Sequence, residues 1–447
     1  MKKLALLLTI LSLVLMMVSC NSNSDIEQDG SSLTIAFPIG NKHIDRAISK
    51  YENLYPDVEL NIITEESIKM EEIESFYKTL STEIMAGNGP DVIIGDRYFD
   101  VNKIIYNGVF ADMSNFFDND SDFNKDEYNM DVLNAGNIDG EQLVIPLTYS
   151  VPILLSTDGM LEKTGFNPEN CGDFFSFWSE LESLDNRIKN NPELPQMLIR
   201  TPVTLKYFMS MSGINWIDYK NKSFNLDNPE VKQSYDYFKK LLSLDYGDQL
   251  INPRGEDAYW CASSLKKEIS VLEISMRSSP DLLMEAMAIN SFDNAAIFPI
   301  RDINGTVQAE VQEFVAVNNS SKNLQNAYNF IKLLIDPEIV STGSQEFFEH
   351  IPISNLAFKK MMKEEYTERA PIQAGNETTD NFDEIFPITD EFINEYMSIL
   401  DDVSGAYFIS PMQREIRFIM EQYYADEKTY EECMETLNNT LKIYMTE

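Results

Sequence analysis

The chain has 447 residues, of which 43% are hydrophobic, and this length is enough for two or more domains with buried cores. Its 73 acidic and 35 basic residues give a formal net charge of −38, which nucleic acid and anionic lipid headgroups would repel. Composition therefore excludes a nucleic-acid-binding protein and a disordered chain.

Residues 1–20 are predicted to be a targeting segment. Two lysines precede the apolar run 4–18, which is too short to span a membrane comfortably and is followed at once by small and polar residues. Val18-Ser19-Cys20 resembles a bacterial lipobox, in which Cys20 is lipidated, although Met17 stands where a leucine is usual. A transmembrane anchor or a plain secretion signal is the alternative. Residues 21–32 are polar and are predicted to form a flexible tether.

The remaining cysteines and the two histidines offer little material for metal binding or for histidine-dependent catalysis. Cys171, Cys261 and Cys433 are odd in number and lack the close spacing of metal ligands, so we predict no metal and no cofactor. One disulfide among the three stays open, although buried reduced side chains are favoured.

The body of the chain opens with a strand, a helix and a second strand. Leu33 to Phe37 is predicted to be a strand that Pro38 ends. Apolar residues within 45–54 recur at helical spacing, and 58–63 has the composition of a strand.

The stretch 76–98 is predicted to contain a helix, a turn and a buried strand. The helical pattern ends at Ala86-Gly87-Asn88-Gly89, where Gly or Asn accepts the left-handed backbone that closes a helix. Pro90 prevents the helix from continuing, and 91–94 is a short apolar strand. Asp96-Arg97-Tyr98 follow it, at the carboxyl end where open α/β sheets bind ligands. An ordinary connection with a solvated ion pair is the alternative.

Later segments continue the alternation of strands and helices. Asp139-Gly140 predicts a hairpin turn into the strand 141–146, and Asp173 predicts the N-cap of a helix with an aromatic face. Asn304-Gly305 predicts a turn between two strands, before an amphipathic helix that Pro337 ends. Residues 404–413 are predicted to be a loop with aromatic residues.

Taken in order, these segments resemble the extracellular solute-binding proteins of ABC transporters, the type that includes maltodextrin-binding protein. The resemblance covers nearly the whole chain after residue 32 and is carried by "AGNGPDV" with "GVFADMSNF", by "IDGEQLVIPLTYSVPILLST" and by "NNSSKNLQNAYNFIKLLIDPE". It implies an α/β fold of type II, with two lobes and a hinged cleft between them. We expect 33–147 and 303–350 in lobe 1, and 148–302 and 351–447 in lobe 2.

The resemblance also implies which side chains face the cleft. Asp96, Arg97 and Tyr98 are the best-placed candidates for ligand contact. Packing is the alternative for Phe37 and Tyr149, and a surface ion pair is the alternative for Arg277. The weaker candidates are Phe37, Tyr149, Trp260, Met276, Arg277 and Tyr407.

The expected function is capture of a small solute, with an oligosaccharide favoured, and its delivery to an ABC permease. We expect a monomer without catalytic activity, anchored through Cys20 at the extracytoplasmic face of the cell membrane. Peptides, polyamines and other polar solutes stay open as ligands. A secreted glycoside hydrolase with paired carboxylates and a sensor component that does not import are the two alternative functions.

Overall fold

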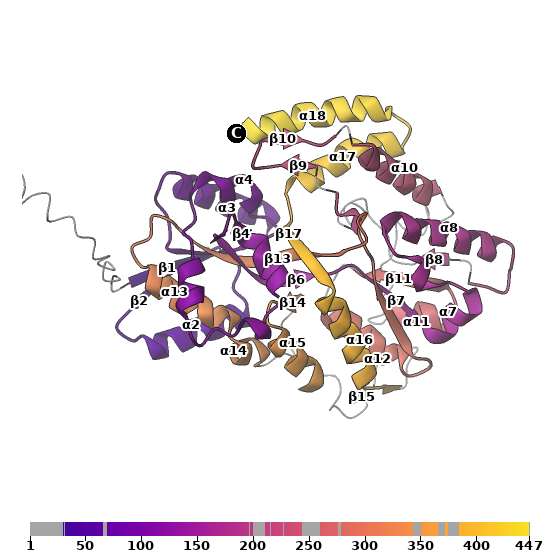
Figure 1. Ribbon diagram of the computed structural model, residues 1–447, viewed down its shortest axis with the longest axis horizontal. Helices are drawn as coiled ribbons and strands as arrows, with labels where there is room; N and C mark the ends of the chain where they lie inside the picture. Colours follow the sequence, from indigo (N-terminus) through magenta and orange to yellow (C-terminus); the bar gives the residue numbers. More distant parts are fainter. Residues whose placement is uncertain are drawn as a thin grey trace, which may run out of the picture.

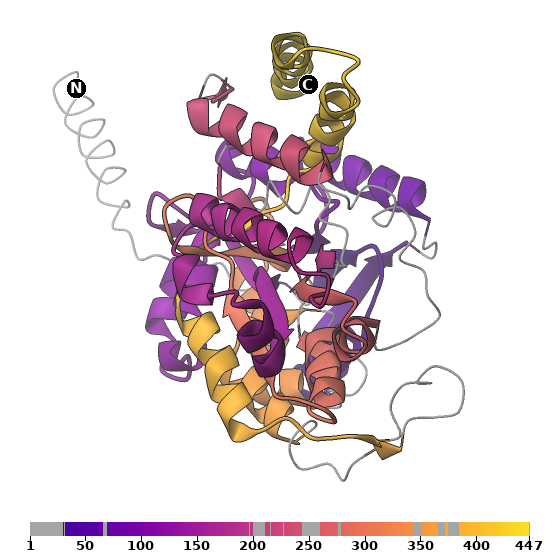
Figure 2. The same cartoon turned by 90° about the vertical axis from the view of Figure 1, so that its right-hand side faces the viewer.

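The computed structural model describes residues 30, 32–65, 69–195, 197–199, 211–214, 216–226, 228–243, 260–275, 279–342, 350–364, 372–373 and 384–446. Two β-sheets with helices packed on their faces lie side by side, one in each lobe (Figures 1 and 2).

The first sheet has seven strands in the order β14-β6-β13-β3-β1-β2, and β17 also pairs with β13. β1 runs parallel to β2 and β3, whereas β13 is antiparallel to β3 and β6. Apolar side chains fill the central strands β1 and β3 because helices cover both faces there. The strands are β1 (Ser32–Phe37), β2 (Glu59–Thr64), β3 (Val92–Asp96), β6 (Val144–Ser150), β13 (Val307–Val317), β14 (Ile351–Pro352) and β17 (Val403–Phe408).

Helices α2, α3 and α13 of the first lobe form where the sequence predicts helices. The Asn41 side chain accepts a hydrogen bond from the Ile44 N–H and so caps α2, and Gly87 has the left-handed φ of 75° that closes α3. Tyr51 of α2 meets Phe330 of α13 edge to face, with ring centroids 5.7 Å apart. The principal helices are α2 (Lys42–Leu54), α3 (Met70–Met85), α4 (Val101–Ile104), α13 (Leu324–Ile335) and α15 (Asn355–Met362).

The second sheet has four strands in the order β12-β7-β11-β8. Helices α8, α10, α17 and α18 build a second core on one face, while α11, α12 and α16 join the first core on the other. In both views α17 and α18 lie at the opposite end of the molecule from α16 (Figures 1 and 2). The elements are β7 (Ile153–Thr157), β8 (Met197–Ile199), β11 (Ser270–Ser275), β12 (Ala295–Pro299), α7 (Asp158–Thr164), α8 (Phe174–Lys189), α10 (Pro229–Ser243), α11 (Trp260–Lys266), α12 (Ser279–Ile289), α16 (Asp390–Asp401), α17 (Met412–Tyr424) and α18 (Tyr430–Thr446).

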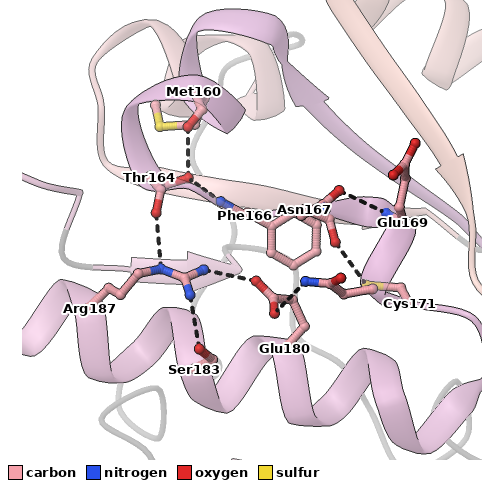
Figure 3. A network of polar contacts seen from close by, with 10 residues as sticks. Met160, Thr164, Phe166, Asn167, Glu169, Cys171, Glu180, Ser183 and Arg187 are labelled. Carbon is pink, nitrogen blue, oxygen red and sulfur yellow. Dashed lines mark hydrogen bonds and ion pairs between the residues drawn. The ribbon is translucent and has the colours of Figure 1, made fainter.

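Arg187 of α8 joins α8 to the C-terminal end of α7 (Figure 3). Its Nε donates to the Thr164 carbonyl oxygen at 3.1 Å, and its Nη2 donates to Glu180 Oε1 at 2.9 Å. Its Nη1 donates to Ser183 Oγ at 2.9 Å. Asp173 caps the same helix in a reciprocal capping box with Ser176, which confirms the predicted helix start.

The chain passes between the sheets at residues 151–152 and 300–306, where the Ile300 N–H donates to the Pro152 carbonyl oxygen at 2.9 Å. It passes from β17 to α17 through residues 409–411. These segments are the connections about which the lobes can rotate.

Sheet pairing differs from the expected lobe boundaries in three places. Ile351–Pro352, expected at the start of a second-lobe segment, form β14 and pair with β6 of the first sheet. The break expected after residue 147 falls inside β6, which is continuous over Val144–Ser150. Residues 403–408, expected as a loop in the second lobe, form β17 and pair with β13 of the first sheet. The local sequence did not indicate this, because the strand gains its hydrogen bonds from a partner about a hundred residues away.

Candidate functional site

Polar side chains form a row across the end of the first sheet that adjoins the crossovers. In the strand register Asp96 of β3 lies opposite Glu313 of β13, and Glu313 lies opposite Thr148 of β6. Glu313 Oε2 accepts from Thr148 Oγ1 at 3.1 Å, and its Oε1 accepts from Asn41 Nδ2 at 3.3 Å. Because Asn41 starts α2, the turn after β1 reaches the same edge, where open sheets bind ligands.

A second polar row lies behind the first, around Glu310. This residue lies opposite Ser150 of β6 and Tyr407 of β17, and it is only 4% exposed. Its Oε2 accepts from the Tyr407 hydroxyl at 3.2 Å, and its Oε1 accepts from Gln312 Nε2 at 2.9 Å. The register shifts at Gln312, and such a bulge re-aims side chains. Gln312 Nε2 also donates to Ser150 Oγ at 2.8 Å.

Sequence reasoning missed Glu310 and Glu313. Both lie in a strand of mostly apolar residues, VQAEVQEFVAV. Burying a carboxylate in a central strand is costly unless it is hydrogen-bonded. Two glutamates in an otherwise apolar strand could therefore have indicated a functional role for Glu310 and Glu313.

Asp96 is half-buried at the carboxyl end of β3. Its Oδ1 accepts from the Tyr98 N–H at 2.8 Å, a short turn that fixes the carboxylate in place. Burial raises the pKa of Asp96, while the hydrogen bond from the Tyr98 N–H, the nearby Tyr77 hydroxyl and the charge of Arg97 lower it in part. The carboxylate thus lies in a setting where further hydrogen-bond donors would be favourable.

Arg97 and Tyr98 form a stacked pair beside this carboxylate. The Arg97 guanidinium carbon lies 5.1 Å from the centroid of the Tyr98 ring, and Arg97 Nη2 lies 3.2 Å from the Tyr98 hydroxyl oxygen. Arg97 is exposed, and Tyr98 is half-buried against the first core. The pair offers an aromatic surface, a hydroxyl group and a cation at the sheet edge.

Phe37 and Tyr149 are packed in the core, which was the alternative to ligand contact for both residues. Phe37 is 4% exposed and Tyr149 has no exposed surface, so neither ring is available to a solute in this arrangement. Side chains alternate along a strand, and because Thr148 and Ser150 face the polar rows, Tyr149 points to the opposite face. There the Tyr149 hydroxyl accepts from Asn129 Nδ2 at 3.4 Å.

Of the remaining candidate ligand residues, only Tyr407 has a described side chain. Tyr407 joins the second polar row through Glu310. Trp260 begins α11, where only its backbone is described. Met276, Arg277 and Cys20 lie outside the described residues. Cys171 and Cys433 are free thiols, so neither is in a disulfide.

No group of three or more His, Cys, Asp or Glu side chains in the described part of the chain is arranged to hold a metal ion. No helix within the described ranges is long and apolar enough to cross a membrane.

The sequence of this chain matches the model of a known protein family. Residues 38–340 match the model of the family described as "Bacterial extracellular solute-binding protein". No curated protein matches the sequence.

Solved structures with similar folds have low sequence identity to this chain. An ABC substrate-binding protein from Listeria monocytogenes, in complex with cycloalternan, has a TM-score of 0.56 and 14% identity, covering 93% of this chain and 99% of that one. The sugar-binding protein MalE from Xanthomonas citri has a TM-score of 0.60 and 11% identity, covering 93% and 97%. A cyclic α-maltosyl-1,6-maltose binding protein from Arthrobacter globiformis has a TM-score of 0.54 and 14% identity, covering 93% and 98%.

These likenesses confirm the predicted two-lobe α/β fold. Since the family model covers more than half of the sequence, the chain belongs to the bacterial extracellular solute-binding protein family.

Proposed function

We propose that this protein binds an oligosaccharide at the polar edge of the first sheet and delivers it to the permease of an ABC importer. The observation that carries the proposal is the half-buried Asp96 carboxylate beside the stacked Arg97–Tyr98 pair. Support also comes from similar folds whose ligands are cycloalternan, mannotriose and maltose.

The chemistry of this edge suits a sugar. The carboxylates of Asp96 and Glu313 accept hydrogen bonds from hydroxyl groups, and the Arg97 guanidinium donates to hydroxyl oxygens. The Tyr98 ring offers a flat surface for the apolar face of a pyranose. A few convergent polar groups against an aromatic surface are typical of small-molecule sites.

Transport requires the two lobes to exchange between open and closed arrangements. A solute held at the end of the first sheet contacts the second lobe only when the lobes close, so its binding energy favours closure. The closed form would dock on the permease, and the crossovers at 151–152, 300–306 and 409–411 would act as hinges.

The proposal includes no catalysis. A glycoside hydrolase places two carboxyl groups so that they flank the scissile bond. Asp96 and Glu313 instead lie side by side on neighbouring strands, on one side of any solute that rests on the sheet edge. Incubation of the purified protein with sugar polymers is expected to give no release of reducing ends.

The proposal also includes a lipid anchor at Cys20. Cys20 would carry a lipid, and the residues that follow it would tether a monomeric binding domain at the extracytoplasmic face. The expected tether 21–32 is too long at its end, because Ser32 belongs to β1 and the Gly30 N–H donates to Asn323 Oδ1. A Cys20→Ala variant is expected to move from the membrane fraction to the soluble fraction of the producing bacterium. Retention of this variant in the membrane would contradict lipidation at Cys20.

A thermal-shift screen of the chain from residue 21 onward tests the function. Mono- and oligosaccharides, amino acids and polyamines are compared, because a ligand that binds only the folded state raises the melting temperature. A saccharide shift that is lost in Asp96→Ala and in Arg97→Ala is the expected result. A shift with amino acids or polyamines and with no saccharide would overturn the carbohydrate assignment.

A further inference from the structure

One set of polar contacts between the two lobes, outside the crossovers, lies on the side of the molecule away from α16. There α3 and α4 of the first lobe face α17, α18 and the hairpin β9 (Ile217–Asp218) and β10 (Ser223–Phe224) of the second (Figure 1). The site residues Asp96-Arg97-Tyr98 immediately precede α4 in the chain.

The central contact joins Asp100, at the start of α4, to Tyr444 in the last helix. Asp100 Oδ2 accepts a hydrogen bond from the Tyr444 hydroxyl, although the two residues are 344 positions apart. The Tyr444 hydroxyl oxygen lies 3.5 Å from that of Tyr219, which donates to Ser410 Oγ at 2.6 Å. We call Asp100, Tyr444, Tyr219 and Ser410 the interlobe latch.

The latch adjoins one of the crossovers. Ser410 belongs to the 409–411 segment that leads from β17 to α17. On the first-lobe side, Asn102 Nδ2 donates to the Phe408 carbonyl oxygen at 2.9 Å, which fastens α4 to the end of β17. A rotation that carries α18 away from α4 therefore keeps the crossover attached to the first lobe and breaks the Asp100–Tyr444 bond.

Two ion pairs flank the latch. Arg414 Nη1 lies 2.8 Å from Glu74 Oε1, and Lys220 Nζ lies 2.7 Å from Asp139 Oδ2. The four side chains are 39–70% exposed, and ion pairs with this exposure contribute little to stability.

The Asp100–Tyr444 bond lies between two half-buried side chains, whereas the side chains of these ion pairs are 39–70% exposed. Burial is the largest cause of the raised pKa of Asp100 and of the raised pKa of Tyr444. The Lys103 ammonium lies 4.7 Å from the centroid of the Tyr444 ring and supports the negative charge of Asp100. A hydrogen bond to a carboxylate is stronger than one between neutral groups, and partial burial limits the competition from water, so we expect this bond to contribute most among the contacts on this side.

We propose that the Asp100–Tyr444 bond holds the two lobes together in the absence of any solute. The open and closed arrangements are then balanced partly by a contact within the protein, and the solute supplies only the rest of the free energy of closure. Because the closed arrangement binds solute more tightly, the apparent affinity rises with the fraction of molecules that are closed before binding.

Tyr444→Phe removes the hydroxyl and keeps the ring. The matched control is Tyr423→Phe, because the Tyr423 hydroxyl also donates to an aspartate, Asp236 Oδ1 at 2.7 Å, but both residues belong to the second lobe. Asp100→Ala removes the carboxylate that accepts the hydrogen bond from Tyr444. Small-angle X-ray scattering of the chain from residue 21 onward, without ligand, measures the separation of the lobes.

Tyr444→Phe and Asp100→Ala are expected to increase the radius of gyration, while Tyr423→Phe leaves it at the wild-type value. Far-UV circular dichroism of each variant checks that the lobes remain folded. Scattering curves of folded Tyr444→Phe and Asp100→Ala that superpose on the wild-type curve would overturn the latch. No solute enters the measurement, so its outcome is independent of the proposed carbohydrate function.

Discussion

The carboxylates of Asp96 and Glu313 belong to residues paired across neighbouring antiparallel strands, at the edge where the turn after β1 also arrives. Like charges opposite each other in a sheet are destabilising when both are ionised, and burial already raises the pKa of Asp96 toward its neutral form. Such local costs are found where a protein needs a particular chemistry, and a polar solute with several donors would relieve the repulsion.

Replacing Glu313 by Gln should weaken solute binding by roughly tenfold, which is the loss of about 1.4 kcal/mol for one charge-assisted hydrogen bond. The amide oxygen can accept from Asn41 Nδ2 while the amide NH2 donates to Thr148 Oγ1, so the fold is kept. Isothermal titration with the saccharide found by thermal shift measures the change, and Glu141→Gln, at an exposed position of the same lobe, is the control. Unchanged affinity in Glu313→Gln would remove Glu313 from the site.

Tyr149→Phe should lower the free energy of unfolding by about 1 kcal/mol and leave solute affinity unaltered. The lost hydroxyl accepts only from Asn129 and faces away from the polar rows. Urea denaturation and calorimetric titration of the same preparation separate the two effects. A loss of affinity without a loss of stability would return Tyr149 to the ligand site.

His43 should make stability depend on pH in mildly acidic solution. Burial, together with the charge of Arg46, lowers its pKa from 6.5 to about 4, so between these values the unfolded chain binds a proton that the folded protein does not. Stability is therefore present in full above pH 6.5 and is lost as pH falls toward 4, by about 3 kcal/mol for a shift of this size.

Unfolding of wild type and His43→Gln is compared by urea titration at several pH values across this window. The difference between the two proteins isolates the histidine, because their carboxylates titrate alike. A difference that is constant from pH 7 to the acid end of the window would contradict the prediction.

Arg187→Met should destabilise the second lobe by about 1–3 kcal/mol, because it leaves Glu180 Oε1 and the Thr164 carbonyl oxygen without the donor that Arg187 supplies. The control is Lys189→Met on the same helix, which breaks an ion pair between Lys189 and Asp185 whose lysine is 52% exposed. Equal thermal shifts for the two variants would show that the Arg187 network adds no more than a surface ion pair.

Local signals in the sequence were sufficient for much of the fold. The Gly87 turn, the Asp173 cap and the strand before Asp96 each follow from a few neighbouring residues, and each is present. The placement of Asp96-Arg97-Tyr98 at the carboxyl end of a buried strand follows from the same local pattern.

Features that depend on distant partners were not predictable in this way. β17 becomes a strand only because β13 offers it a partner, and the bulge at Gln312 is set by the pairing of β13 with β6. The face of β6 to which Tyr149 points depends on the same pairing. The Asp100–Tyr444 bond joins residues 344 positions apart in the sequence, and no local pattern predicts a contact over that separation.

Calorimetric titration of the chain from residue 21 onward with oligosaccharides, in wild type and in Arg97→Ala, tests the central claim most directly. We predict saturable binding of at least one oligosaccharide by wild type, weakened at least tenfold in Arg97→Ala with an unchanged melting temperature of the free protein. Binding of the same saccharide with equal affinity by both proteins would contradict the proposed site. Absence of binding to every saccharide, alongside saturable binding of an amino acid or polyamine, would contradict the proposed ligand class.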